Sequence, residues 1–197
     1  MNEVTISNNK EEFSINWDKI NQINEDIIAW ITIRDTNINY PILKDNEELK
    51  YLKKSYDGTK NKNGSIFTIN NNPFIDNVTT VYGHNMKNGT MFSELRNYLD
   101  EEFLYKHQKF NIYTKNQNYI ATIFSCYTVN IYEEIDKLKN LNFNEELEYY
   151  KEKSKYQVKD IENIEKIIKL STCSYINNYT YPTTERYFII AKLEKIN

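Results

Sequence analysis

Residues 164–173 read IEKIIKLSTC, an apolar, β-prone run that ends in a thiol at Cys173. Thirteen residues later, Arg186 begins a second run of the same kind, RYFIIAKL, which extends to Leu193. Short runs rich in Ile, Phe and Tyr predict β-strands, here over 166–172 and 186–193. A thiol therefore stands at the end of one predicted strand, and a guanidinium at the start of the next.

Similar runs recur along the chain, separated by turn residues. They predict further strands at 30–33, 38–43, 65–69, 77–82, 110–114 and 119–127. Pro41 gives its strand an edge or irregular position, because proline cannot donate a backbone hydrogen bond. Seven or eight short strands with few helices among them predict a mainly β fold, a single closed or nearly closed β-barrel with helical decoration.

Helices are predicted around this barrel. Apolar residues spaced by three and four predict a helix over 16–30 at the N-terminus, and shorter helical pieces are predicted at 46–55, 91–98 and 101–107. The segment 133–156 is charged, rich in Leu, Glu and Lys, and free of Gly and Pro. It predicts one or two amphipathic helices inserted between strands, with a break near 142–144.

Length and composition predict one domain over residues 1–197, with residues 1–14 as a flexible N-terminal segment. The net charge of −3, with no basic block, argues against nucleic-acid binding. No run approaches the roughly 18 apolar residues of a membrane span, and residues 1–4 lack the features of a signal peptide. The expectation is a cytosolic protein, or one from which an N-terminal anchor has been trimmed.

Three residues could together perform nucleophilic chemistry. Cys173 ends its predicted strand, His84 follows the predicted strand at 77–82, and Arg186 begins the last one. Strand ends are common positions for functional groups. With ordinary pKa values, about 3% thiolate and about 24% imidazolium exist at pH 7, so the doubly competent form is under about 1% unless the groups are coupled. A thiol, an imidazole and a guanidinium can act as nucleophile, acid or base, and anion stabiliser, which points to acyl transfer through a thioester.

Structural interpretations compete with this one. Cys173 could be a buried core thiol or pair with Cys126 in a disulfide, which would block the nucleophile. Cys126 lies in the middle of a predicted strand and is expected to be buried and structural. His84 could be a structural residue that caps its own loop through hydrogen bonds. His107 is expected at the surface or at a helix end. Arg186 could be a solvated strand end or an ion-pair partner of a residue such as Glu185. The two His and two Cys are dispersed, so we expect no zinc site and no other cofactor.

Several segments together resemble the sortase family, and class B sortases most closely, over about residues 15–193. The segments that carry the resemblance are NEDIIAWI (24–31), TNINYPI (36–42), GSIF (64–67), YGHNMKNGTMF (82–92) and LSTC (170–173). The resemblance implies a barrel of about eight strands in which His84, Cys173 and Arg186 converge. It also implies that the helical insertion lies between the sixth and seventh strands. No equivalent is visible of the aromatic lid that precedes the barrel in class C sortases.

The resemblance also implies a reaction and its setting. Cys173 would attack the threonine carbonyl of an Asn-Pro-x-Thr sorting signal, and a peptidoglycan amine would resolve the thioester. His84 would exchange the proton and Arg186 would stabilise the oxyanion, with Leu52, Tyr132, Ser171 and Thr172 as substrate contacts. The partners would be sorting-signal-bearing surface proteins and the peptidoglycan precursor. The enzyme would be a monomer anchored by its N-terminus at the outer face of a Gram-positive cell membrane.

Two departures and two alternatives accompany this hypothesis. Lys169 stands where the family often has Thr, and the segment 174–185 is longer than in typical class B members. One alternative is a catalytically silent, sortase-like module that binds sorting peptides. The other is a papain-like hydrolase, which the order of residues disfavours because His84 precedes Cys173 by 89 residues and Cys173 ends a strand.

Overall fold

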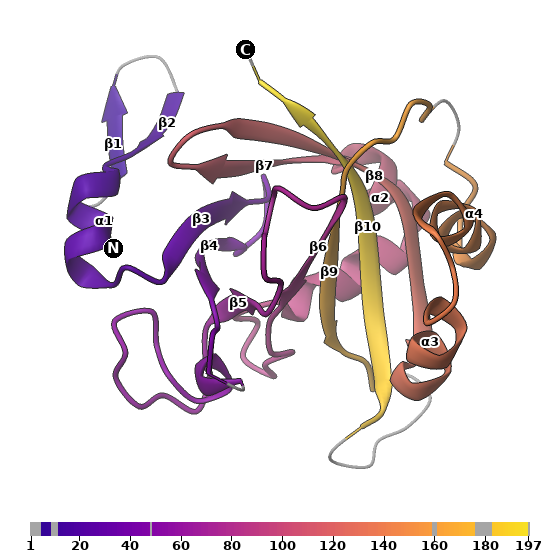
Figure 1. The fold of residues 1–197 in the computed structure, drawn as a ribbon, viewed down its shortest axis with the longest axis horizontal. Coiled ribbons are helices and arrows are strands. Elements are labelled where there is room, and N and C mark those ends of the chain that lie inside the picture. Colours follow the sequence, from indigo (N-terminus) through magenta and orange to yellow (C-terminus); the bar gives the residue numbers. More distant parts are fainter. Residues whose placement is uncertain (1–4, 9–11, 48, 159–160, 176–182, 197) are drawn as a thin grey trace.

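The computed structural model describes residues 5–8, 12–47, 49–158, 161–175 and 183–196. Within them, eight strands close into one barrel in the order β10-β8-β7-β3-β4-β5-β6-β9 (Figure 1). Their bounds are β3 Ile27–Thr32, β4 Asn39–Lys44, β5 Ile66–Thr68, β6 Val78–Tyr82, β7 Lys109–Thr114, β8 Asn118–Asn130, β9 Ile167–Cys173 and β10 Glu185–Lys195. The predicted closed barrel is confirmed.

Most neighbouring strands of the barrel are antiparallel, but β4 with β5 and β6 with β9 are parallel. Strand β9 lies between β6 and β10, parallel to the first and antiparallel to the second. The carboxyl ends of β6 and β9 therefore meet the amino end of β10 at one end of the barrel. This arrangement brings together the three strand ends that carry the predicted functional residues.

Helices cover two sides of the barrel, with α1 on one side and α3 and α4 on the other (Figure 1). The helical elements are α1 Trp17–Ile23, η1 Lys50–Leu52, η2 Ser93–Leu99, α2 Glu101–Lys106, α3 Ile131–Leu138 and α4 Phe143–Lys153. Helices α3 and α4 lie between β8 and β9, the sixth and seventh strands of the barrel, which confirms the predicted insertion. The predicted break is also present, because Asn142 caps α4 and forms a capping box with Glu145.

The first predicted helix is wrong beyond Ile23. The backbone N–H of Asn24 still bonds to Ile20, but Asn24 is extended and its side chain accepts the N–H of Asp26. Residues 27–30 then pair with their neighbours as β3. Consecutive apolar residues fit a helix or a strand equally well. Here they form a strand because they pair with β4 on one side and β7 on the other. The predicted helix at 46–55 is likewise reduced to η1, and the one at 91–98 is the 3-10 helix η2.

The predicted flexible segment 1–14 contains most of a short hairpin of β1 (Thr5–Asn8) and β2 (Glu12–Ile15). The rest of that segment, residues 1–4 and 9–11, lies outside the described residues. No helix in the described ranges is both long enough and apolar enough to span a membrane.

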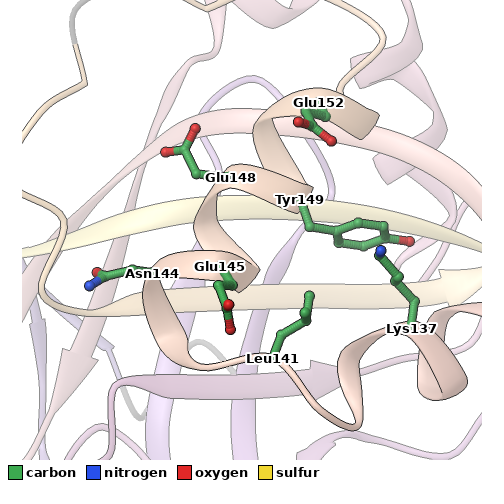
Figure 2. A pocket seen from close by; sticks show the side chains of 7 residues that line it. All are labelled: Lys137, Leu141, Asn144, Glu145, Glu148, Tyr149 and Glu152. Carbon is green, nitrogen blue, oxygen red and sulfur yellow. The ribbon is translucent and has the colours of Figure 1, made fainter.

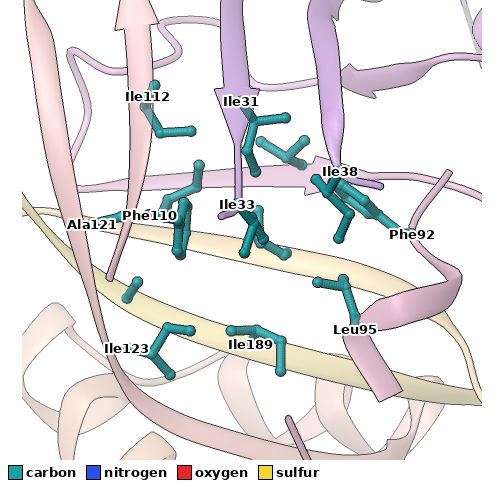
Figure 3. Packing of buried hydrophobic residues seen from close by; sticks show 14 of the residues in the cluster. Ile31, Ile33, Ile38, Phe92, Leu95, Phe110, Ile112, Ala121, Ile123 and Ile189 are labelled. Atoms are coloured by element: carbon teal, nitrogen blue, oxygen red, sulfur yellow. The ribbon is translucent and has the colours of Figure 1, made fainter. Parts of the chain in front are cut away.

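Three apolar clusters hold these elements together. The largest fills the barrel with side chains from β3, β7, β8, β10 and η2, including Ile31, Phe110 and Ile189 (Figure 3). A second lies between α4 and the outer face of β8 and β10, and a third includes Ile20 of α1 and Trp30 of β3. Each fully buried large apolar side chain contributes about 1.5–3 kcal/mol. The barrel is thus packed from within and from two sides, which makes it a rigid support for the strand ends.

Candidate functional site

Cys173 is the last residue of β9 and lies directly opposite Arg186 of β10. Residues directly opposite each other in antiparallel strands point to the same face of the sheet, with Cβ atoms about 4.5–5.5 Å apart. Cys173 is half-buried and its thiol is free. The predicted nucleophile and anion stabiliser therefore share one face at one end of the barrel.

The segment that carries His84 is bonded to the end of β9. Tyr82 pairs with Ser171, and the N–H of Gly83 donates to the Ser171 carbonyl at 3.1 Å. The Thr172 hydroxyl donates to the Gly83 carbonyl at 2.7 Å, and the Asn85 amide donates to the Cys173 carbonyl at 2.7 Å. These bonds fix residues 83–85 beside residues 171–173, so the structure brings the backbone of His84 to the same strand ends as Cys173.

His84 is half-buried and its Nε2 lies 2.9 Å from the Leu52 carbonyl oxygen. Its neighbour Gly83 has no room for a side chain, since a Cβ there would lie 2.4 Å from Ile66 and 2.7 Å from Phe92. The expected close approach of another part of the chain at Gly83 is therefore present. This close approach packs the segment that carries His84 against Ile66 and Phe92.

Arg186 is oriented by backbone carbonyls. Its Nη1 donates to Thr183 at 2.7 Å and to Glu185 at 2.9 Å. The contact with Glu185 is to its main chain, so the alternative of an Arg186–Glu185 ion pair is not found among the described residues. Nε and Nη2 make no further hydrogen bond within that part of the chain, which leaves them able to bind an oxyanion. The N–H of Ser174, next to Cys173, already donates to the Glu185 carbonyl at 2.9 Å.

The four predicted substrate contacts differ in exposure. Tyr132 is 70% exposed on α3, and Leu52 is half-buried with its carbonyl on His84. Helix α3 is held near Arg186, because Asn130 at its N-terminus donates to the Thr184 hydroxyl at 3.0 Å. Ser171 and Thr172 are buried, and the Thr172 hydroxyl is used in its bond to Gly83.

Sequence reasoning missed a buried charge cluster on the same face of β9. The Lys169 ammonium contacts Glu134 of α3 at 2.5 Å and lies 4.1 Å from the Phe188 ring centroid. The hydroxyls of Tyr127 and Tyr149 donate to the same carboxylate, each at 2.8 Å. Burial lowers the pKa of Lys169, while Glu134 opposes that shift. The only signal in the sequence was Lys169 itself, a lysine in an apolar strand.

The other cysteine and histidine are structural. Cys126 is buried as predicted, its thiol donates to the Tyr98 carbonyl at 3.2 Å, and burial raises its pKa to about 11. Both cysteines are free, so the alternative of a Cys126–Cys173 disulfide is wrong. His107 ends α2 as expected, but it is buried against Phe103 rather than at the surface.

Two surface hollows are lined by other residues. One, of about 370 Å³, lies between α3 and α4, where Lys137 and Tyr149 point toward one another and Glu145, Glu148 and Glu152 extend along α4 (Figure 2). The other, of about 770 Å³, is lined by the β3–β4 connection and by residues 105–111. Neither is lined by His84, Cys173 or Arg186, so neither is assigned to the site.

The barrel and its three converging strand ends are shared with a known family. The family model for the sortase domain matches residues 31–194, so the chain belongs to the sortase family. Among curated relatives, sortase B of Listeria monocytogenes is 38% identical over 167 residues, covering 81% of this chain and 68% of that protein. Sortase B of Staphylococcus aureus is 29% identical over 206 residues, covering 99% and 81%.

Solved structures agree with this assignment. A crystal structure of S. aureus sortase B has a TM-score of 0.80 and 28% identity, covering 92% of this chain and 87% of that chain. Sortase B of Clostridium perfringens has a TM-score of 0.80 and 27% identity, covering 91% and 100%. A substrate complex of the S. aureus enzyme has a TM-score of 0.79 and 28% identity, covering 91% and 85%. The resemblance to class B sortases is confirmed.

Proposed function

We propose that this chain is a cysteine transpeptidase that cleaves a C-terminal sorting signal of the Asn-Pro-x-Thr type. It would transfer the acyl group to an amine of a peptidoglycan precursor. The pairing of Cys173 with Arg186, beside a histidine segment bonded to the same strand end, is the observation that supports this most. It occurs in a chain of the sortase family, among whose structural neighbours is a sortase B–substrate complex.

The proposed acylation begins with the Cys173 thiolate attacking the threonine carbonyl. Negative charge develops on the carbonyl oxygen. Nε and Nη2 of Arg186, which make no hydrogen bond among the described residues, stabilise it. The Ser174 N–H is engaged by Glu185, so Arg186 is the stronger candidate for this role. His84 protonates the leaving amine as the C–N bond breaks, and a thioester remains on Cys173.

In the second half-reaction an amine attacks the thioester. His84 takes the proton from this amine, and the Cys173 thiolate leaves. Tyr132 and Leu52 are proposed as contacts of the peptide, because both adjoin the strand ends and are not fully buried. Ser171 and Thr172 are also proposed as peptide contacts, although both side chains are buried. The partners are surface proteins that carry sorting signals, and the place of action is the outer face of a Gram-positive cell membrane.

An acyl-adduct experiment tests the proposal. The protein is incubated with a panel of fluorogenic Asn-Pro-x-Thr peptides and examined by mass spectrometry. An adduct on Cys173 is expected in the wild type and in Cys126→Ala, whose thiol is buried away from the site, but not in Cys173→Ala. If no peptide of the panel forms an adduct, the chain is instead the catalytically silent peptide-binding module.

A further inference from the structure

The hydrogen bond on His84 determines which ring nitrogen carries a proton. Nε2 lies 2.9 Å from the Leu52 carbonyl oxygen, and a carbonyl oxygen can only accept a hydrogen bond. Nε2 must therefore be protonated in neutral imidazole while this bond is made. Nδ1 makes no hydrogen bond within the described part of the chain. It is the nitrogen left to exchange a proton with a substrate.

The position of the Leu52 carbonyl is possible only because residue 64 has no side chain. Gly64 has φ +62, and a Cβ there would lie 2.6 Å from the Tyr51 carbonyl oxygen and 2.8 Å from that of Leu52. Both obstructing atoms belong to the backbone, so they cannot rotate away as a side chain could. A side chain at position 64 must displace the carbonyl that His84 contacts.

The surroundings of Leu52 are otherwise firmly bonded. The buried Asp45 carboxylate accepts the Tyr51 N–H at 3.0 Å, and the Tyr51 hydroxyl donates to Asp26 at 2.6 Å. The Ser65 N–H donates to the Tyr51 carbonyl at 2.9 Å. These contacts fix Tyr51 and, through it, the neighbouring Leu52, while Gly64 leaves room for both carbonyls. A change at Gly64 would be transmitted to the Leu52 carbonyl.

We propose that Gly64 is a positioning residue, which acts through the Leu52 carbonyl to hold His84 as the Nε2–H tautomer and to reserve Nδ1 for proton transfer. The inference rests on the proposed transpeptidase function. Nδ1–H of the imidazolium gives its proton to the leaving nitrogen, which takes the electron pair of the broken C–N bond. Neutral Nδ1 then accepts a proton from the attacking amine as the C–S bond breaks, which restores the imidazolium.

The chain offers a matched control, because Gly58 also has positive φ, +82, but a Cβ there would meet no atom within 4 Å. Gly64→Ala and Gly58→Ala therefore share the backbone strain and differ in the clash with Leu52. Both are compared with the wild type by ¹⁵N NMR of the imidazole rings at about pH 8.5, where histidine is mostly neutral. The chain has two histidines, and a His107→Gln variant assigns the signals.

The wild type and Gly58→Ala are expected to show the Nε2–H tautomer of His84. Gly64→Ala is expected to lose it and to lose about 100-fold in kcat, as misplacement of a reacting group can cause. Gly58→Ala should remain within about twofold of the wild type, because no contact to Leu52 changes. An Nδ1–H tautomer in the wild type, or an unchanged Nε2–H tautomer in Gly64→Ala, would overturn the proposal.

A second variant decides the question if Gly64→Ala does not fold. Replacing Lys53 by its α-hydroxy acid turns the Leu52 carbonyl from an amide into an ester carbonyl, a weaker acceptor, without adding atoms at Gly64. The Nε2–H population of His84 should fall, and an unchanged population would refute the role of Leu52. The tautomer is read without substrate, so this result is separate from failure of the peptide panel, which concerns the proposed function alone.

Discussion

Lys169 and Cys173 stand on the same face of β9, four residues apart, and the regions around them differ in their access to water. Lys169 is 4% exposed and lies beneath the helical insertion, paired with Glu134. Cys173 is half-buried at the strand end, opposite an arginine of which only Nη1 forms a hydrogen bond among the described residues. One face of β9 thus carries both a buried ion pair and the proposed nucleophile, and the helical insertion covers only the first.

The largest expected effect is on stability, from Lys169→Met. This change leaves the Glu134 carboxylate buried without its cation, which costs about 3–5 kcal/mol of unfolding free energy. Chemical denaturation measures it. The control Lys151→Met breaks an exposed pair with Glu148 and should cost at most about 1 kcal/mol. If both variants lost the same free energy of unfolding, the buried pair would contribute no more to stability than the exposed pair.

A loss of activity without a loss of stability is expected from Arg186→Lys. A lysine keeps the charge but cannot reproduce the planar fork that Nη1, Nη2 and Nε form, so kcat/KM should fall by about 100-fold. The unfolding midpoint should be unchanged. Arg96→Lys, on an exposed position of η2, is the matched control and should keep full turnover. Near-wild-type turnover of Arg186→Lys would remove Arg186 from the mechanism.

The smallest expected effect is the pH dependence of stability that arises from the buried Cys126 thiol. Burial raises the pKa of Cys126 to about 11 from an ordinary value of 9.0, so the unfolded chain releases this proton first as the pH rises. The associated stability is complete below about pH 8 and is lost between about pH 9 and 11. Between pH 8 and 10 it amounts to about 1 kcal/mol.

Denaturation at both pH values, in the wild type and in Cys126→Ala, measures this loss. The buried tyrosines titrate in both proteins, so most of their contribution cancels in the difference. Only Tyr98, whose pKa the Cys126 charge helps to raise, adds to the effect of the thiol. The alanine variant should lose about 1 kcal/mol less than the wild type on going from pH 8 to pH 10. The same slope in both proteins would show that the Cys126 thiol does not contribute.

The sequence predicted the barrel because most strands are short apolar runs bounded by turns, and it placed the insertion correctly. It failed at residues 27–30, where consecutive apolar residues fit helix and strand equally and only pairing with β4 and β7 decides. His84, Cys173 and Arg186 could be proposed because each lies at the end or start of a predicted strand, within segments that resemble one family. The Lys169–Glu134 contact joins residues 35 apart across a helix–sheet interface, which no local pattern records.

The hydrogen bonds of the site were also beyond sequence reasoning. Asn85 was visible only as part of a motif, and its bond to the Cys173 carbonyl depends on the parallel register of β6 and β9. The steric role of Gly64 depends on a backbone 12 residues away. Positive φ is foreseeable for a glycine in a turn, but the atoms that a side chain would strike are not.

The parallel pairing of β6 with β9 has a consequence for how the protein is made. Chains are synthesised from the N-terminus, and contacts between distant segments form slowly because a long loop must first be closed. Strand β9 begins 85 residues after β6 ends and needs β10, the last strand of the barrel in chain order, as its other neighbour. A nascent chain that stops before Glu185 carries His84 and Cys173 but has an open barrel and lacks the guanidinium of Arg186. The thiol thus meets its complete surroundings only after β10 has been synthesised.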